Sequence, residues 1–270
     1  MGRLIEQPIR DLVAAGREAV RKDIYEHSPL KFFVWLGLIY LKTHLKDRLY
    51  RLHLDERKGS EKIADSYDWH HLHHLHAVVR CFYTGSAISS EVVGSFVRLN
   101  VSMEPPGQEQ FDFGDLYLAQ TMMLRLDDFA FVTVFSDAGC SLRYFGTKLK
   151  RLNGPLNFIQ LREVMAEIAA IRLHMKTEPT FRSDIDLFKQ THLIYAEPAD
   201  NELVEWHPEV RGRLLHSSIQ TMKPLPAFAR YSEEEALELI KAGKITFLFD
   251  DNGDFLSADR RWGLLPPERQ

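Results

Sequence analysis

Five histidines lie within seven residues, and their spacing could hold a metal ion. They are His70, His71, His73, His74 and His76. On an α-helix, His70 and His74 would project from one face, as two ligands of Zn²⁺ or another divalent metal do. A further ligand would have to come from the preceding helix, which carries His44, Asp47, His53 and Asp55. The alternative is a solvated helix whose polar face uses histidine, with His76 in the core.

The segment RLYRLH, from Arg48 to His53, could act on a phosphodiester. Its arginine and histidine spacing is similar to the ribonuclease motif of HEPN domains, in which a helical dimer brings these residues together. The resemblance implies that His53 is an acid/base or 2′-hydroxyl-positioning group, that Arg48 binds phosphate, and that the chain forms a homodimer. On a straight helix the two residues lie about 140° apart, so the alternative is solvated residues beside a leucine stripe.

A basic stretch in the same region could contact nucleic acid. Its candidate phosphate ligands are Lys42, Lys46, Arg48 and Arg51. Asp47, Asp55 and Glu56 dilute the positive charge, so a salt-bridged, solvated helix face is the alternative interpretation.

Composition limits the class of protein. The 270 residues are 45% hydrophobic and 27% charged, with a net charge of −4, which is typical of a globular chain without a global basic field. The two cysteines, Cys81 and Cys140, make no C-x-x-C pair and favour a reducing, cytoplasmic location. The longest apolar run, 32–41, is about half of what a bilayer requires, so no membrane association is expected. The sequence also lacks the Walker A, Rossmann and G-x-S-x-G motifs.

Hydrophobic periodicity predicts an α+β fold that is predominantly helical. An amphipathic helix is expected over 2–26, and Ser28–Pro29 begins a central hydrophobic helix that ends at Gly59. In its second half, Leu41, Leu45, Leu49 and Leu52 are expected to face inward. Asp68 caps a third helix that Gly85 ends, with Trp69, Leu72, His76, Val79 and Phe82 on its buried stripe.

The remainder predicts a small antiparallel sheet and a mixed tail. Strands over 96–136 include a hairpin that turns at Asp127–Asp128. The further expected elements are helices over 140–152 and 155–176, a helix capped by Ser232 and Glu235, and a hairpin around 250–253. The predicted division is a body of residues 1–178 and a C-terminal segment of 179–270, or one continuous domain.

Several phrases resemble a known group of proteins. These are FVWLGLIYLKTHLKDR, DERKGSEKI, YDWHHLHHLHAVVRCFYTG and DLYLAQTMMLRLDDFAFVTVFSDAG. They look like the helical region that follows the zinc-ribbon HNH module in bacterial HNH-endonuclease-type proteins. In that family, C-x-x-C pairs and a water-activating histidine carry the chemistry. None of these stands ahead of the matching region here, so no catalytic residue is carried over.

Three functions therefore remain open. The first is an accessory or diverged, non-catalytic domain of an HNH-nuclease-like protein that contacts nucleic acid, a nuclease partner chain or another protein. The second is a metal- or histidine-dependent nuclease that uses His70 and His74, or Arg48 and His53. The third is an interaction protein without a nucleic-acid role. Whether the chain is an enzyme, and whether Met1 is its natural start, stay open.

Overall fold

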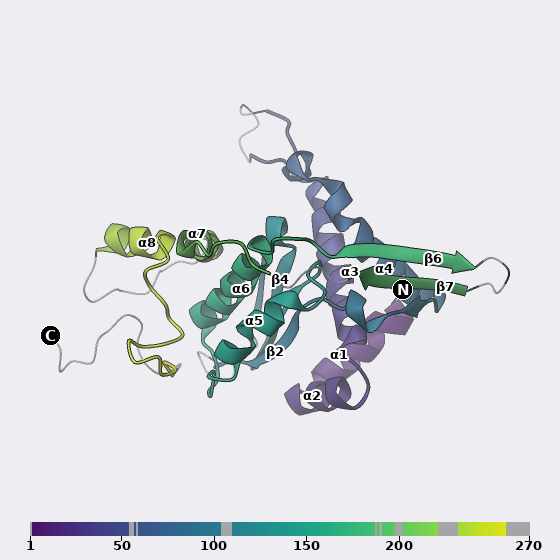
Figure 1. The fold of residues 1–270 in the computed structure, drawn as a ribbon, viewed down its shortest axis with the longest axis horizontal. Helices are drawn as coiled ribbons and strands as arrows, with labels where there is room; N and C mark the ends of the chain where they lie inside the picture. The colour runs from purple at the N-terminus through teal and green to yellow at the C-terminus, as the bar shows by residue number, and fades with distance from the viewer. Residues whose placement is uncertain are drawn as a thin grey trace. The chain divides into compact units, whose positions relative to one another are not determined.

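The computed structural model places the chain in two compact units. It describes residues 2–53, 57, 59–103, 110–186, 188, 191–197, 202–220 and 232–257. The first unit consists of Met1–Val93 and Pro179–Pro198, and the second of Gly94–Glu178 and Ala199–Gln270. Helices and two separate sheets make the chain α+β, as the sequence predicts (Figure 1). None of the helices in the described ranges has the length and apolar composition needed to cross a bilayer.

The first unit is mainly helical and carries a three-stranded sheet. Its helices are η1 (a π-helix, Gly2–Glu6), α1 (Gln7–Ala14), α2 (Arg17–Glu26), α3 (Leu30–Asp47), η3 (Ile63–Ser66), η4 (Trp69–Leu72), α4 (His73–Thr84) and η5 (Ser90–Val92). Its strands are β1 (Ala87–Ile88), β6 (Thr180–Asp186) and β7 (Thr191–Glu197). The strand order is β1-β7-β6, with β1 parallel and β6 antiparallel to β7. The β6–β7 hairpin therefore returns the chain beside β1, so the first unit contains part of the predicted C-terminal segment.

The N-terminal helices differ from the prediction in one respect. A single helix was expected over 2–26, but the chain breaks between α1 and α2 at Gly16. The backbone φ of Gly16 is 92°, a conformation that glycine adopts without steric cost. The sequence pattern continues across this break because both helices bury apolar residues, Ile9 in α1 and Val20 in α2.

Helix α3 begins where the sequence predicts and ends earlier. The hydroxyl of Ser28 accepts a hydrogen bond from the Leu30 N–H at 3.1 Å. The helix stops at Asp47 instead of Gly59, because the backbone then turns back on itself. The Leu52 N–H donates to the Glu61 carbonyl at 2.8 Å, and Arg51 forms an antiparallel bridge with Lys62. Leu49 and Leu52, beyond the helix end, are exposed, and so is Leu45 within α3, so the prediction that these three face inward is wrong.

The predicted third helix, which follows α3 in the chain, starts with a tighter turn than expected. The Asp68 carboxylate accepts from the His70 N–H at 3.0 Å, and Gly85 ends α4 with a φ of 67°, as predicted. Trp69–Leu72, however, form a 3₁₀ turn, and α4 begins only at His73. The buried face of α4 carries Leu75, Val78 and Cys81, so His76 is exposed and not part of a buried stripe.

The second unit is built on a four-stranded antiparallel sheet. Its strands are β2 (Phe96–Asn100), β3 (Phe111–Leu116), β4 (Thr121–Leu126) and β5 (Phe129–Val134), in the order β2-β5-β4-β3. Its helices are η6 (Tyr117–Ala119), α5 (Cys140–Leu149), α6 (Phe158–Leu173), α7 (Pro208–Ile219) and α8 (Glu233–Lys241). The hairpin of β4 and β5 turns at Asp127–Asp128, as the sequence predicts.

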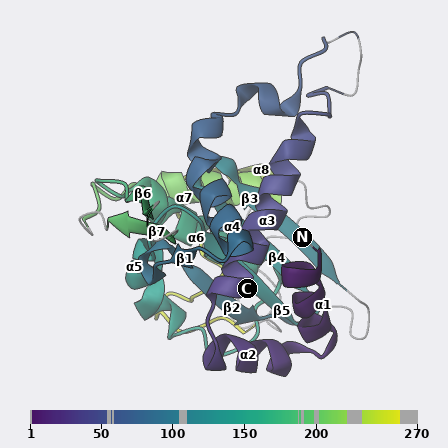
Figure 2. The same cartoon turned by 90° about the vertical axis from the view of Figure 1, so that its right-hand side faces the viewer.

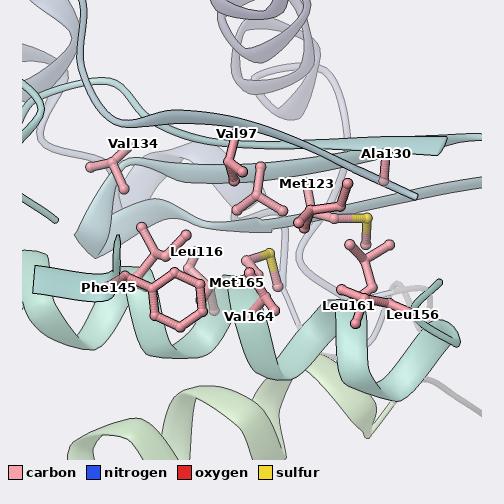
Figure 3. Close-up of a cluster of buried hydrophobic side chains, with 14 of the residues drawn as sticks. Val97, Leu116, Met123, Ala130, Val134, Phe145, Leu156, Leu161, Val164 and Met165 are labelled. Atoms are coloured by element: carbon pink, nitrogen blue, oxygen red, sulfur yellow. The ribbon is translucent and has the colours of Figure 1, made fainter. Parts of the chain in front are cut away.

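Helix α6 packs on one face of this sheet. Met123 from β4 and Val97 from β2 face Val164 and Met165 of α6, and Phe145 of α5 closes one end (Figure 3). Asn157 and Gln160 form a capping box at the start of α6. Helix α7 packs against α6, and α8 packs against α7. The result is a continuous apolar core between the sheet and α6.

Candidate functional site

Helices α3 and α4 of the first unit leave a groove between them. The two helices lie side by side (Figure 2). The groove has a volume of about 590 Å³, within the range of small-ligand and peptide sites. Its lining residues are mostly apolar. They are Leu38, Leu41, Lys42, Leu45, Arg48, Trp69, Leu72, His73, His76, Val79, Arg80, Tyr83 and Thr84.

The lining residues follow a heptad spacing on both helices. Along α3 and its C-cap the row is Leu38, Leu41, Leu45 and Arg48. Along α4 and the η4 residue before it the row is Leu72, His76, Val79 and Tyr83. Steps of three and four residues keep such a row on one helical face, as in helices that pack lengthwise against another helix. Both rows face the same groove, so a third helix could pack lengthwise against α3 and α4 there.

The groove has a buried floor and an exposed apolar rim. Leu38, Leu41 and Leu72 are at most 8% exposed, whereas Leu45 is 50% exposed. Beyond the end of α3, Leu49 and Leu52 are also more than half exposed. An exposed leucine on the rim of an apolar groove is typical of an interaction surface.

The charged residues of the groove are all basic. No aspartate or glutamate is among its lining residues. Lys42 forms an ion pair with Glu6, which lies outside the lining, and the Arg48 guanidinium lies 5.5 Å from the centre of the Trp69 ring. In the described ranges, no carboxylate forms an ion pair with Arg80. Burial raises the pKa of Tyr83, with a further contribution from Glu6.

The five histidines are divided between different surroundings. His73 and His76 line the groove, and His70 packs edge-on against His73, with ring centres 4.8 Å apart. His74 instead stacks on Phe181 of β6 at 4.3 Å. Because His70 lies in the 3₁₀ turn and His74 in α4, the two residues are not four apart on one α-helix.

The predicted additional metal ligands have other partners. His44 is buried, with its Nδ1 2.8 Å from the Tyr40 carbonyl, and Asp47 accepts a hydrogen bond from the Tyr67 hydroxyl at 2.7 Å. Asp55 lies outside the described residues. Among the residues that the structure describes, no three histidines, cysteines or acids are grouped to hold a metal. The zinc site at His70 and His74 stays a prediction.

The Arg48 and His53 motif does not lie on one helix. Arg48 is the C-cap of α3, and His53 lies beyond the bridge that Arg51 makes with Lys62. Both side chains are exposed, as are Lys46 and Arg51. Of the four predicted phosphate ligands, only Lys42 and Arg48 line the groove. Catalysis by Arg48 and His53 stays a prediction.

Sequence reasoning missed two groove residues that matter chemically, Arg80 and Tyr83. The heptad spacing of the leucines on α3 was a readable signal. The matching row on α4 was harder to assign, because the predicted phase of that helix placed His76 inside.

One cysteine has a histidine neighbour. The Cys81 Sγ lies 3.6 Å from Nδ1 of His192 on β7. Burial raises the pKa of the Cys81 thiol, which disfavours the nucleophilic thiolate. This pair is therefore a packed contact of a buried thiol.

The second unit contains a buried ionic cluster. Glu163 of α6 is fully buried and accepts from Nη1 of Arg211 on α7 at 2.7 Å and from the Phe247 N–H at 2.5 Å. Arg211 also donates to the carbonyls of Gly243 and Ile245. Burial raises the pKa of Glu163 to about 6, although Arg211 opposes the shift. The cluster joins α6, α7 and the segment after α8.

The raised pKa of Glu163 should make the stability of the chain depend on pH. Its pKa is about 6 in the folded chain against an ordinary 4.5, so the folded state retains a proton that the unfolded state releases. The stabilisation from protonated Glu163 is complete below the pKa of the unfolded chain. It is lost as the pH rises through the pKa of the folded chain, a change of about 2 kcal/mol in the free energy of unfolding. Urea denaturation between about pH 4 and pH 7 should show this fall in the wild type and not in Glu163→Gln. Parallel pH profiles for the two proteins would contradict the assignment.

Comparisons with protein-family models, with characterised proteins and with solved structures found no match.

Proposed function

We propose that this chain is a non-catalytic binding module whose α3–α4 groove receives an amphipathic helix of a partner protein. The observation that carries the proposal is the pair of heptad-spaced rows that line the groove, whose buried members form its apolar floor. Helix-in-groove recognition uses apolar anchors at the same spacing on the incoming helix. A third helix would complete the layer that α3 and α4 begin.

The size of the groove suits such an occupant. Two turns of an amphipathic helix present about three to four apolar side chains on one face. Their burial would also remove Leu45 from water, and burying a leucine side chain stabilises by about 1.5–3 kcal/mol in full.

A charge placed on the rim should weaken this binding. We expect Leu45→Asp to weaken the binding of a fluorescein-labelled helical peptide, with leucines at heptad spacing and glutamines elsewhere, by tenfold or more, about 1.4 kcal/mol. The reason is that the aspartate would lose its hydration against the leucines of the peptide. Fluorescence anisotropy measures the dissociation constant.

The matched control is Leu118→Asp. Leu118 lies in η6 of the second unit, is 72% exposed and is not among the groove's lining residues, so the change adds the same charge at a residue outside the lining. Binding that survives Leu45→Asp, or that both variants lose equally, would refute the groove as the docking site. No binding of the peptide to the wild type would refute the proposed function.

Nucleic-acid contact is the second candidate, favoured by the exposure of Lys42, Lys46, Arg48 and Arg51. Binding of an oligonucleotide would then weaken steeply with salt, and Arg48→Ala with Arg51→Ala would reduce it. If the resemblance to HNH-associated regions holds, the partner is a chain that bears the HNH module. We also propose a cytoplasmic location for the chain, because Cys81 and Cys140 are both free thiols.

A further inference from the structure

We infer that the helix received by the α3–α4 groove is acidic, and that Arg80 selects it by binding one of its carboxylates. This inference rests on the proposed function and adds the chemistry of the partner. It starts from the charge of the groove: Lys42, Arg48 and Arg80 line it, together with His73 and His76, and no carboxylate does. The chain as a whole has a net charge of −4, so this local excess is opposite in sign to the rest of the molecule.

Arg80 differs from the other two cations in its surroundings. Lys42 is paired with Glu6, and the face of the Arg48 guanidinium is engaged by the Trp69 ring. Within the described part of the chain, Arg80 makes no ion pair, and its side chain is exposed. A guanidinium presents donors in a planar fork that matches a carboxylate in a bidentate pair. Arg80 is therefore the cation most available to an incoming acid.

The position of Arg80 places it at the edge of the apolar floor. It follows Val79, which is buried in the floor, and lies four residues after His76 and four before Thr84. Residues four apart are neighbours on a helix surface, so α4 presents His76, Arg80 and Thr84 in one polar file along the groove. If a bound helix placed its leucines on the groove floor, the residues beside those leucines would lie against His76, Arg80 and Thr84. Acidic flanking residues complement it, and basic ones repel it.

The lining favours a protein helix over a nucleic acid. Single-stranded nucleic acids bind grooves in which bases stack on aromatic rings. Here the floor is made of leucine and valine, and the lining rings are Trp69, which Arg48 already contacts, Tyr83, and the imidazoles of His73 and His76. Aliphatic floors of this kind complement leucine side chains.

The test compares three labelled helical peptides that share leucines at heptad spacing. Their other positions carry glutamate, glutamine or lysine. We expect the glutamate peptide to bind the wild-type chain at least tenfold more tightly than the lysine peptide at low salt, with a difference that shrinks as salt is added. Arg80→Glu should remove or reverse this preference. Arg10→Glu, which makes the same change of charge on exposed residue 10 of α1, should leave it intact.

The outcomes separate the inference from the proposed function. Equal binding of all three peptides, or a preference unchanged by Arg80→Glu, overturns the inference and leaves the groove as a helix site. No binding of any peptide overturns the proposed function itself. A 20-nucleotide oligo(dT) that displaces the glutamate peptide and depends on Arg80 would make nucleic acid the occupant. Concentration-dependent dimerisation lost in Leu45→Asp would make a second copy the occupant. Either result overturns the acidic-helix assignment.

Discussion

Replacing Glu163 with leucine is expected to lower the free energy of unfolding by about 3–5 kcal/mol, the usual cost of breaking a buried ion pair. The change removes the carboxylate that pairs with Arg211 at 2.7 Å and accepts from the Phe247 N–H. Arg211 is 6% exposed, so its charge stays in the interior. Its remaining partners are backbone carbonyls and Glu167, whose Oε1 is 3.7 Å from the Arg211 Nε. Urea denaturation followed by circular dichroism measures the loss.

Two further variants separate the cost of leaving Arg211 unpaired from the cost of lost packing at residue 163. Glu163→Leu combined with Arg211→Met should recover much of the stability, because replacing both partners leaves no unpaired charge. Glu202→Gln breaks the Lys176–Glu202 pair, whose side chains are 59% and 65% exposed, and should cost at most about 1 kcal/mol. If Glu163→Leu costs no more than Glu202→Gln, the buried pair does not stabilise the second unit.

Local patterns in the sequence predicted most of the elements but not where some of them stop. Caps were readable, because Ser28, Asp68, Gly85 and Ser232 act through their own neighbours. The end of α3 was not, since its leucine spacing continues past Asp47. That spacing is consistent with a longer helix, and the backbone pairing of 50–52 with 61–63 takes the chain out of it. Periodicity therefore located the apolar residues without showing whether they face a core or a partner.

Burial on α6 shows the same limit. The hydrophobic periodicity of residues 155–176 puts Ile159, Met165 and Ile168 on one helix face, and these residues are buried. Arg162 and Glu163 on other faces are buried as well, because α7 packs against α6 from a position about 50 residues later in the chain. A charged residue normally indicates a solvated face, and only the contact with Arg211 explains why Glu163 does not follow that rule.

The candidate site was half predictable. Of the four candidate phosphate ligands that the sequence offered, Lys42 and Arg48 line the groove, whereas Lys46 and Arg51 do not. Arg80 was not selected, because an isolated arginine on a helix carries no signal until its neighbours are known. Its importance comes from the absence of acids among the lining residues, and that depends on how α3 and α4 pair.

Replacing Gly212 with alanine is expected to destabilise the second unit by about 1–3 kcal/mol or more, although alanine normally favours a helix interior. Gly212 lies in α7, where a Cβ would come within 3.0 Å of the carbonyl oxygens of Ile240 and Lys241 at the end of α8. Backbone atoms cannot rotate away as a side chain can, so the two helices would have to separate. The measurement is the shift of the urea midpoint relative to the wild type.

Gly146→Ala in α5 is the matched control, because nothing lies within 4 Å of its added Cβ. There the same substitution should stabilise by about 0.5–1 kcal/mol, since alanine loses less conformational entropy on folding than glycine. Opposite signs for the two variants would show that the contact between α7 and α8, rather than helix propensity, determines the effect at Gly212. Stabilisation by both would mean that α7 and α8 do not approach each other as closely as the structure places them.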